Sequence, residues 1–194
     1  MRDVTKLVFL DRDGVVNRRP ANDGFITSWA KFQFLPGVAE GIRLLNQHSI
    51  FVVIVTNQRG VNLGLYSESD LHNLHQRMQL ELESKGARLD GIYYCPHGIG
   101  ECECRKPATG MFKQAMRQLP PVEPDAVVVI GNSITDMQAA DRLRCRKVLV
   151  GPERGPILAR LAEQGIHVEF ACESLLEAVE KYILPAELNR VRRS

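Results

Sequence analysis

Short apolar runs alternate with amphipathic stretches through most of the chain. The runs KLVFLD, IFVVIVTN and DAVVVIGN are almost uniformly apolar, which is typical of strands that are buried on both faces. Between them, segments 36–48, 67–86 and 110–119 space their apolar residues as one face of a helix. This alternation predicts an α/β fold, in which a three-layer, doubly wound, mostly parallel sheet of the Rossmann type is covered by helices.

The same reasoning extends the pattern to the rest of the chain. Further strands are expected over 89–96, 147–151 and 167–171, and further helices over 135–144, 156–165 and 173–183. Ser67 and Asp70 have the spacing of a capping box, and Gly86 is placed to end the same helix. Because no repeat or long linker divides the sequence, we expect residues 1–194 to form a single domain.

Composition narrows the class of protein. The chain is 44% hydrophobic and 25% charged, with a formal net charge of +2, so an extended surface for nucleic acid is not expected. It shows no signal-peptide pattern and no apolar window of membrane length, which favours a cytoplasmic protein without a membrane partner. In that compartment the five cysteines indicate metal binding, chemistry or core packing before disulfides. A monomer is the default expectation.

Polar residues follow three of the expected strands. Asp11, Thr56 with Asn57, and Asn132 with Ser133 each come at the end of an apolar run. The carboxyl ends of parallel strands share one edge of the sheet, where ligands bind in open α/β folds. Long loops over 14–35 and 95–110 are placed to surround that edge. The sequence therefore predicts a functional site there.

The residue types at this edge suit phosphoryl transfer. Asp11 alone could be a turn or cap residue, but a fixed carboxylate there could also serve as a nucleophile or a metal ligand. Asp13 could act as acid and base, and Mg²⁺ would relieve the repulsion between the two carboxylates. Thr56 offers a hydroxyl, Lys106 a point cation and Arg105 a planar fork for phosphate. Together these groups favour a reaction through an aspartyl-phosphate.

Four motifs strengthen this interpretation. DRDGVVN, VTNQ, CRKP and GNSITDMQAA resemble, in order, the motifs of the haloacid dehalogenase superfamily of phosphatases, from Leu7 to about Val150. With the stretch GIYYCPHGIGECECRKPATGM, the chain is similar to the small branch of D-glycero-D-manno-heptose 1,7-bisphosphate 7-phosphatases. The phosphatase part of histidinol-phosphate phosphatase is its close sibling. The resemblance implies a haloacid dehalogenase-like fold without a large cap domain and Mg²⁺-dependent removal of the 7-phosphate.

The resemblance also implies roles for individual residues. Asp11 would attack phosphorus, and Asp13 would protonate the leaving oxygen and then activate water. Thr56 and Lys106 would hold the phosphoryl oxygens. Arg12, between the two aspartates, is expected to point away, because alternate residues of an extended chain face opposite sides. The substrate-binding candidates are Asn22, Asp23, Gly24, Phe25, Asn57, Gln58, Arg59 and Arg105.

The implied Mg²⁺ site contains one departure from the family pattern. The ligands would be the Asp11 carboxylate, the Asp13 backbone carbonyl and Asn132, with Asp136 as a further candidate. Most members have aspartate at the position of Asn132, so the uncharged amide predicts weaker Mg²⁺ binding. Two alternatives stay open: a phosphatase for histidinol phosphate or another small phosphomonoester, and a binding protein whose catalysis is weakened by Asn132.

A cysteine-rich loop precedes Arg105 and Lys106. Its pattern is C-x-H-x4-C-x-C, and three thiolates with one imidazole can form a closed tetrahedral Zn²⁺ site. The loop is too short for a core of its own, so metal would order it and fix the two cations over the sheet edge. An unligated, thiol-rich loop is the alternative. The expected zinc ligands are Cys95, His97, Cys102 and Cys104.

Overall fold

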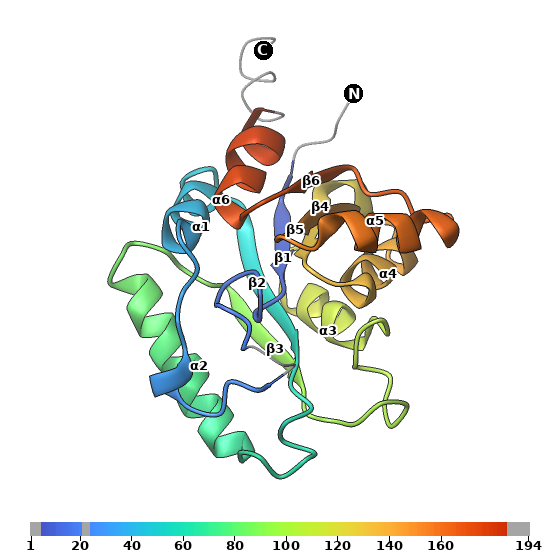
Figure 1. Ribbon diagram of the computed structural model, residues 1–194. Helices are drawn as coiled ribbons and strands as arrows, with labels where there is room; N and C mark the ends of the chain where they lie inside the picture. Colours follow the sequence, from blue (N-terminus) through green and yellow to red (C-terminus); the bar gives the residue numbers. More distant parts are fainter. Residues whose placement is uncertain (1–4, 21–23, 186–194) are drawn as a thin grey trace.

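A computed structural model describes residues 5–20 and 24–185 of the chain and places its strands in one six-stranded sheet (Figure 1). The order is β3-β2-β1-β4-β5-β6, and every neighbouring pair is parallel. The predicted α/β fold is therefore confirmed. The strands are β1 (Leu7–Leu10), β2 (Phe51–Asn57), β3 (Gly91–Cys95), β4 (Val127–Gly131), β5 (Arg146–Val150) and β6 (Phe170–Cys172).

Helices cover both faces of the sheet, which completes the three layers. Figure 1 shows α1, α2 and α6 on one side and α3, α4 and α5 on the other. The last helix continues into a π-helical turn, η4 (Val179–Ile183). The α-helices are α1 (Val38–Gln47), α2 (Glu68–Glu83), α3 (Gly110–Gln118), α4 (Ile134–Arg142), α5 (Arg154–Glu163) and α6 (Leu175–Ala178). Two short 3-10 helices, η2 (Trp29–Lys31) and η3 (Pro124–Ala126), lie in loops.

The uniformly apolar strands are explained by the two cores that they separate. Val8 and Leu10 of β1 pack into the core that also contains residues of α1, α2 and α6. Leu7 and Phe9 alternate with them and face the core beneath α3 and α4. Because every residue of β1 is buried, the strand itself excludes polar side chains, and these are accommodated only beyond its end, at the edge of the sheet.

Element boundaries differ from the sequence expectations mainly at β6, which begins at Phe170 instead of His167. Glu169 accounts for the shorter strand, because its carboxylate accepts from the Lys147 amide at 2.7 Å. The expected capping box of α2 is confirmed, since the Ser67 hydroxyl accepts from the Asp70 amide and the Asp70 carboxylate accepts from the Ser67 amide. In the described part of the chain, no helix has both the length and the apolar character needed to cross a membrane.

Candidate active site

The strand order brings the predicted residues together at the carboxyl edge of the sheet. β1 lies between β2 and β4, and the direction of winding reverses at β1. Asp11 follows β1, and its amide donates to the Ile130 carbonyl of β4 at 3.0 Å. Thr56 lies at the end of β2, and Asn132 directly follows β4. Adjacent parallel strands thus place all three at one point.

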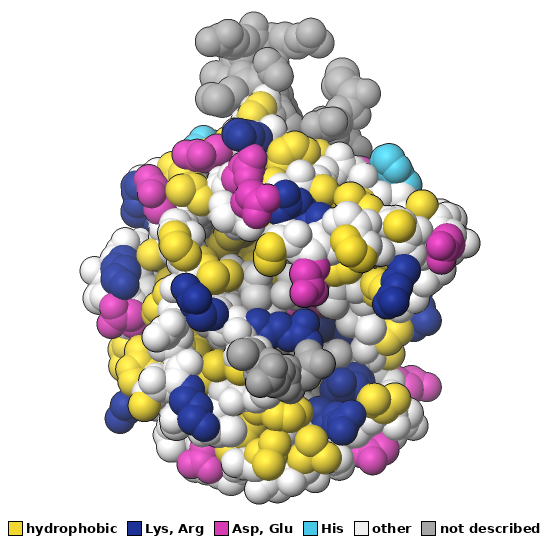
Figure 2. All heavy atoms as spheres, in the orientation of Figure 1, with side chains coloured by type: hydrophobic (Ala, Val, Ile, Leu, Met, Phe, Trp, Pro, Cys, Tyr) yellow, Lys and Arg dark blue, Asp and Glu magenta, His cyan; other side chains and the backbone are white. Residues whose placement is uncertain are grey.

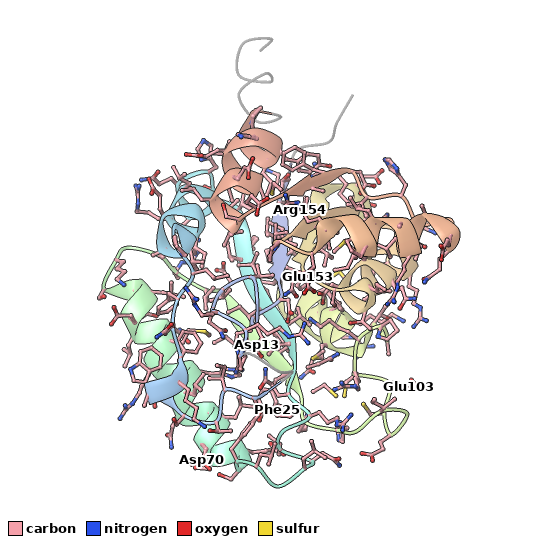
Figure 3. All side chains as sticks on the ribbon, in the orientation of Figure 1. Asp13, Phe25, Asp70, Glu103, Glu153 and Arg154 are labelled. Carbon is pink, nitrogen blue, oxygen red and sulfur yellow. The ribbon has the colours of Figure 1, made fainter. Side chains whose placement is uncertain are left out.

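A cavity of about 410 Å³ opens over this point. A volume of this size suits a small ligand such as a sugar phosphate. Lys and Arg side chains gather near the centre of this face in Figure 2, and Asp13 and Phe25 lie at the same end of the sheet in Figure 3. The lining includes the predicted residues Asp11, Asp13, Gly24, Phe25, Thr56, Asn57, Gln58, Arg59, Arg105, Lys106, Asn132 and Asp136, together with Arg19.

Lys106 is buried between two carboxylates at the floor of the cavity. Its Nζ lies 2.8 Å from Asp11, 2.6 Å from Asp136 and 2.8 Å from the Val55 carbonyl. Burial alone would lower the pKa of Lys106, but Asp11 and Asp136 raise it above its usual range. The ammonium therefore stays charged next to the Asp11 carboxylate.

Asp11 is a carboxylate that is held with little solvation. Its pKa is raised to about 6, mainly by burial and also by the nearby Asp136 and Asp13, while Lys106 acts in the opposite direction. A desolvated carboxylate beside a fixed cation is well suited to attack an electrophilic centre.

Asp13 has a different environment from Asp11. Burial would raise its pKa, but the charge of Arg12 and hydrogen bonds from Asn17 and Gln58 lower it. Arg12 does not line the cavity, in agreement with the expectation that it points away from the reacting centre, but its contact with Asp13 was not expected. Its side chain turns back and donates to both Asp13 carboxylate oxygens at 2.9–3.2 Å. The two aspartates therefore have opposite pKa shifts, which is the pattern expected for groups with different chemical roles.

Two residues predicted to contact the substrate make hydrogen bonds to other residues of the protein. The Asn57 amide donates to the Lys106 carbonyl at 3.2 Å and accepts from the Lys106 amide at 2.9 Å. Gln58 donates to Asp13 and to Thr56, both at 2.9 Å, and its exposed fraction is 2%. Asn57 thus fixes the loop that carries Lys106, and Gln58 links the ends of β1 and β2, so the structure favours positioning roles for both.

The oxygen donors at the strand ends fit a magnesium ion. Gly14, which follows Asp13, has a φ of 95°, and a Cβ placed on it would lie 1.9 Å from Asn132 Nδ2. The Asn132 side chain therefore packs closely against this turn, in a cavity that it shares with Asp11. Mg²⁺ prefers carboxylate, carbonyl and amide oxygens, and Asp11, Asp13 and Asn132, which line this cavity, supply such groups. Asp136 instead pairs with Lys106 and accepts from the Ser133 amide and hydroxyl at the start of α4, which argues against it as a metal ligand.

The remaining substrate-binding candidates lie mostly on the cavity wall. Gly24, Phe25, Arg59 and Arg105 all line it. Buried Nη1 of Arg105 has no hydrogen-bond partner among the described residues, which leaves a cationic donor available to an anionic ligand. Asn22 and Asp23 lie outside the described residues.

The four predicted zinc ligands converge in the loop after β3. Their ligand atoms all lie within 4.8 Å of one another. The Sγ atoms of the three cysteines are 3.1–3.4 Å apart, and His97 Nδ1 lies 3.3 Å from Cys104 Sγ. A tetrahedral Zn²⁺ with Zn–S bonds of about 2.3 Å needs only a slight expansion of this cluster. The cluster therefore fits a structural zinc ion.

Comparison with known proteins agrees with this geometry. The model of the polynucleotide kinase 3 phosphatase family matches residues 6–143. A D-glycero-α-D-manno-heptose-1,7-bisphosphate 7-phosphatase from Mycobacterium bovis is 37% identical over 150 residues, which cover 74% of this chain and 78% of that protein. The corresponding β-anomer phosphatase from Haemophilus ducreyi is 40% identical over 154 residues, with coverage of 75% and 82%.

A solved structure points to the same group of phosphatases. D,D-heptose 1,7-bisphosphate phosphatase from B. bronchiseptica, crystallised with magnesium and phosphate, matches with a TM-score of 0.82 and 35% identity. The match covers 93% of this chain and 99% of that one. The chain therefore belongs to the polynucleotide kinase 3 phosphatase family of the haloacid dehalogenase superfamily, within the group of heptose bisphosphate 7-phosphatases.

Proposed function

We propose that this protein is a Mg²⁺-dependent phosphatase that removes the 7-phosphate of D-glycero-D-manno-heptose 1,7-bisphosphate through an aspartyl-phosphate on Asp11. The observation that carries the proposal is the desolvated Asp11 carboxylate, 2.8 Å from Lys106 Nζ at the floor of a cavity that also contains Asp13 and Thr56. A nucleophile, a fixed cation, a hydroxyl and a second carboxylate are the groups that this chemistry needs.

The geometry suggests a two-step reaction. An Asp11 oxygen attacks phosphorus, and the bond from phosphorus to the sugar oxygen breaks. Asp13, which takes up a proton when the anionic phosphate binds beside it, gives that proton to the sugar oxygen. Asp13 then takes a proton from a water molecule, which attacks phosphorus and releases phosphate and free Asp11. Lys106 and the Thr56 hydroxyl hold the phosphoryl oxygens throughout. Mg²⁺ held by Asp11, the Asp13 carbonyl and Asn132 would neutralise the phosphate charge and orient it for attack.

The cavity wall supports a substrate with a second anionic group. Arg19, Arg59 and Arg105 line the same cavity as Lys106 but come from separate loops. The planar guanidinium group binds phosphate in a bidentate manner. One phosphate at Asp11 would leave these side chains to recognise the other, as expected for a sugar bisphosphate.

We also propose that residues 1–194 form a single domain, and that the protein is a monomer that works in the cytoplasm on a small-molecule substrate. The continuous sheet over the described residues supports one domain. Light scattering combined with chromatography would test the oligomeric state, and a mass of about twice the 21.8 kDa of the chain would contradict it.

Phosphate release from zinc-replete protein tests the function. We would compare both anomers of the heptose 1,7-bisphosphate with histidinol phosphate across a Mg²⁺ titration. The proposal expects a higher kcat/KM for one of the bisphosphate anomers. Activity on histidinol phosphate alone would transfer the function to that substrate, and inactivity at every Mg²⁺ concentration would support a binding protein.

Replacing Asn132 by aspartate is expected to tighten Mg²⁺ binding. The added carboxylate would bring a charge to a hard cation that the amide oxygen ligates only as a dipole. We expect the Mg²⁺ concentration for half-maximal activity to fall by about tenfold, which corresponds to about 1.4 kcal/mol. Asn132→Ser is the control that shortens the side chain without adding charge. An unchanged Mg²⁺ dependence in Asn132→Asp would show that residue 132 is not a metal ligand.

A further inference from the structure

The least expected feature of the site is a fully buried arginine behind Asp13. Arg12 has an exposed fraction of 0%, and it is among the largest fully buried side chains of the described residues. A guanidinium group is costly to bury unless its donors are paired. The hydrogen-bond partners of Arg12 therefore indicate its role in the site.

One edge of the Arg12 fork holds the proton-transfer group. Nε and Nη2 donate to Asp13 Oδ1 at 3.2 and 3.0 Å, and Nη2 also donates to Asp13 Oδ2 at 2.9 Å. Asn17 and Gln58 add one hydrogen bond each to the same carboxylate, both at 2.9 Å. Asp13 is thereby held in one orientation, with 26% of its side chain exposed toward the cavity.

The other side of the fork contacts α2. Arg12 Nη1 lies 3.0 Å from His75 Nε2, and both side chains are buried. Burial and the charge of Arg12 lower the pKa of His75 to about 3, so the imidazole is neutral. A neutral ring with its proton on Nδ1 can accept from Arg12 through Nε2. The His75 ring also lies 5.8 Å from the Tyr94 ring, which limits its movement.

Gln58 and Tyr66 hold the fork from a third direction. Gln58 Oε1 accepts from Arg12 Nη2 at 3.1 Å and from the Tyr66 hydroxyl at 2.7 Å. Together with His75, this pair connects Arg12 to α2 and to the loop before it. The orientation of Arg12, and with it that of Asp13, thus depends in part on His75 and Tyr66, which do not line the cavity.

We propose that His75 is a positioning residue for proton transfer by Asp13, and that it acts through Arg12. The proposal rests on the proposed phosphatase function. Without an acceptor at position 75, Nη1 loses a buried partner and the guanidinium plane is free to turn. Asp13 would turn with it and would deliver its proton to the leaving oxygen less efficiently. Small misplacements of a reacting group are known to reduce rates strongly.

The leaving group provides the test. A sugar alkoxide must be protonated as it leaves, whereas 4-nitrophenolate leaves without a proton, so only the first substrate depends on Asp13 as an acid. We would measure the first step alone by rapid quench, as the release of the sugar or of 4-nitrophenolate before the phospho-aspartate is hydrolysed, with Mg²⁺ and Zn²⁺ present. His75→Leu is expected to lower the rate of leaving-group release by about 10- to 100-fold for the sugar phosphate and by less than about threefold for the aryl ester.

Three further variants complete the experiment. His75→Gln restores an acceptor oxygen and is expected to recover much of the sugar phosphate rate. His72→Gln changes an exposed histidine of the same helix and should leave both rates unchanged. Arg12→Lys keeps the charge but not the fork, so it should show the same selective loss even if His75→Leu does not fold.

The outcomes separate this inference from the function on which it rests. An equal loss on both esters, or no loss in His75→Leu and Arg12→Lys, would overturn the positioning role while leaving the phosphatase in place. A native protein that hydrolyses neither ester would overturn the proposed function, and the inference with it.

Discussion

Asp11→Asn is expected to reduce phosphatase turnover by at least about 10⁴-fold, because the amide cannot form the phosphorus–oxygen bond. The fold should tolerate the change. Lys106 keeps Asp136 at 2.6 Å and the Val55 carbonyl at 2.8 Å, so its charge stays compensated. Turnover of the heptose bisphosphate measures the effect, and chemical trapping of phosphorylated protein shows whether the intermediate is absent.

The stability of the same variant provides an independent check. The pKa of Asp11 is raised from its ordinary value of 3.8 to about 6 in the folded protein, so the folded state binds the proton more tightly. In metal-free protein the stability associated with this group is therefore present at acidic pH and is lost as pH rises to about 6 and above. Asp11→Asn removes this loss, and its melting temperature at pH 7 should equal or exceed that of the native protein.

Asp13→Asn is the matched control, because it keeps the nucleophile. It should still form a trapped phospho-protein from 4-nitrophenyl phosphate, but the intermediate should hydrolyse slowly for lack of a base. Phospho-protein in Asp11→Asn would contradict the assignment of the nucleophile. So would the absence of trapped phospho-protein in both variants while the native protein is labelled.

The sequence predicted the parts of the site that depend on strand topology. Asp11, Thr56 and Asn132 each follow an apolar run, and parallel pairing of β1 with β2 and β4 brings such positions together. The zinc cluster was also predictable, because its ligands lie within ten residues of one another in the chain. In both cases a pattern within short stretches of the sequence was enough for the prediction.

The parts that escaped prediction depend on side-chain packing between distant segments. Arg12 and His75 are 63 residues apart, and their contact needs the register of α2 on the sheet. Strand alternation places Arg12 opposite Asp11, but it carries no information on a side chain that folds back onto its neighbour. Asn57 and Gln58 have the residue types of substrate contacts, and only the structure shows that Lys106, Asp13 and Thr56 use their amides.

Removing the zinc site is expected to abolish most activity without touching the Asp11 carboxylate. Cys102 Sγ accepts from the Arg105 amide at 3.4 Å, and the adjoining Lys106 backbone is fixed by Asn57. In Cys104→Ser, the loop would lose the metal that orders it, and both cations would lose their positions. We expect loss of bound zinc, a melting temperature lower by at least about 5 °C and a kcat/KM lower by about 100-fold.

Cys172→Ala is the matched control, since this thiol is buried outside the cluster and donates to the Ser174 carbonyl at 3.4 Å. It should retain zinc and full activity. Stripping zinc from the native protein with a chelator should reproduce the Cys104→Ser result, and Zn²⁺ but not added Mg²⁺ should reverse it. Full activity in the stripped protein would mean that Asn57 and the Asp11–Lys106–Asp136 contacts hold Lys106 in place without the metal. The size of the loss therefore measures how much of the order at Lys106 comes from zinc and how much from the buried ion pairs.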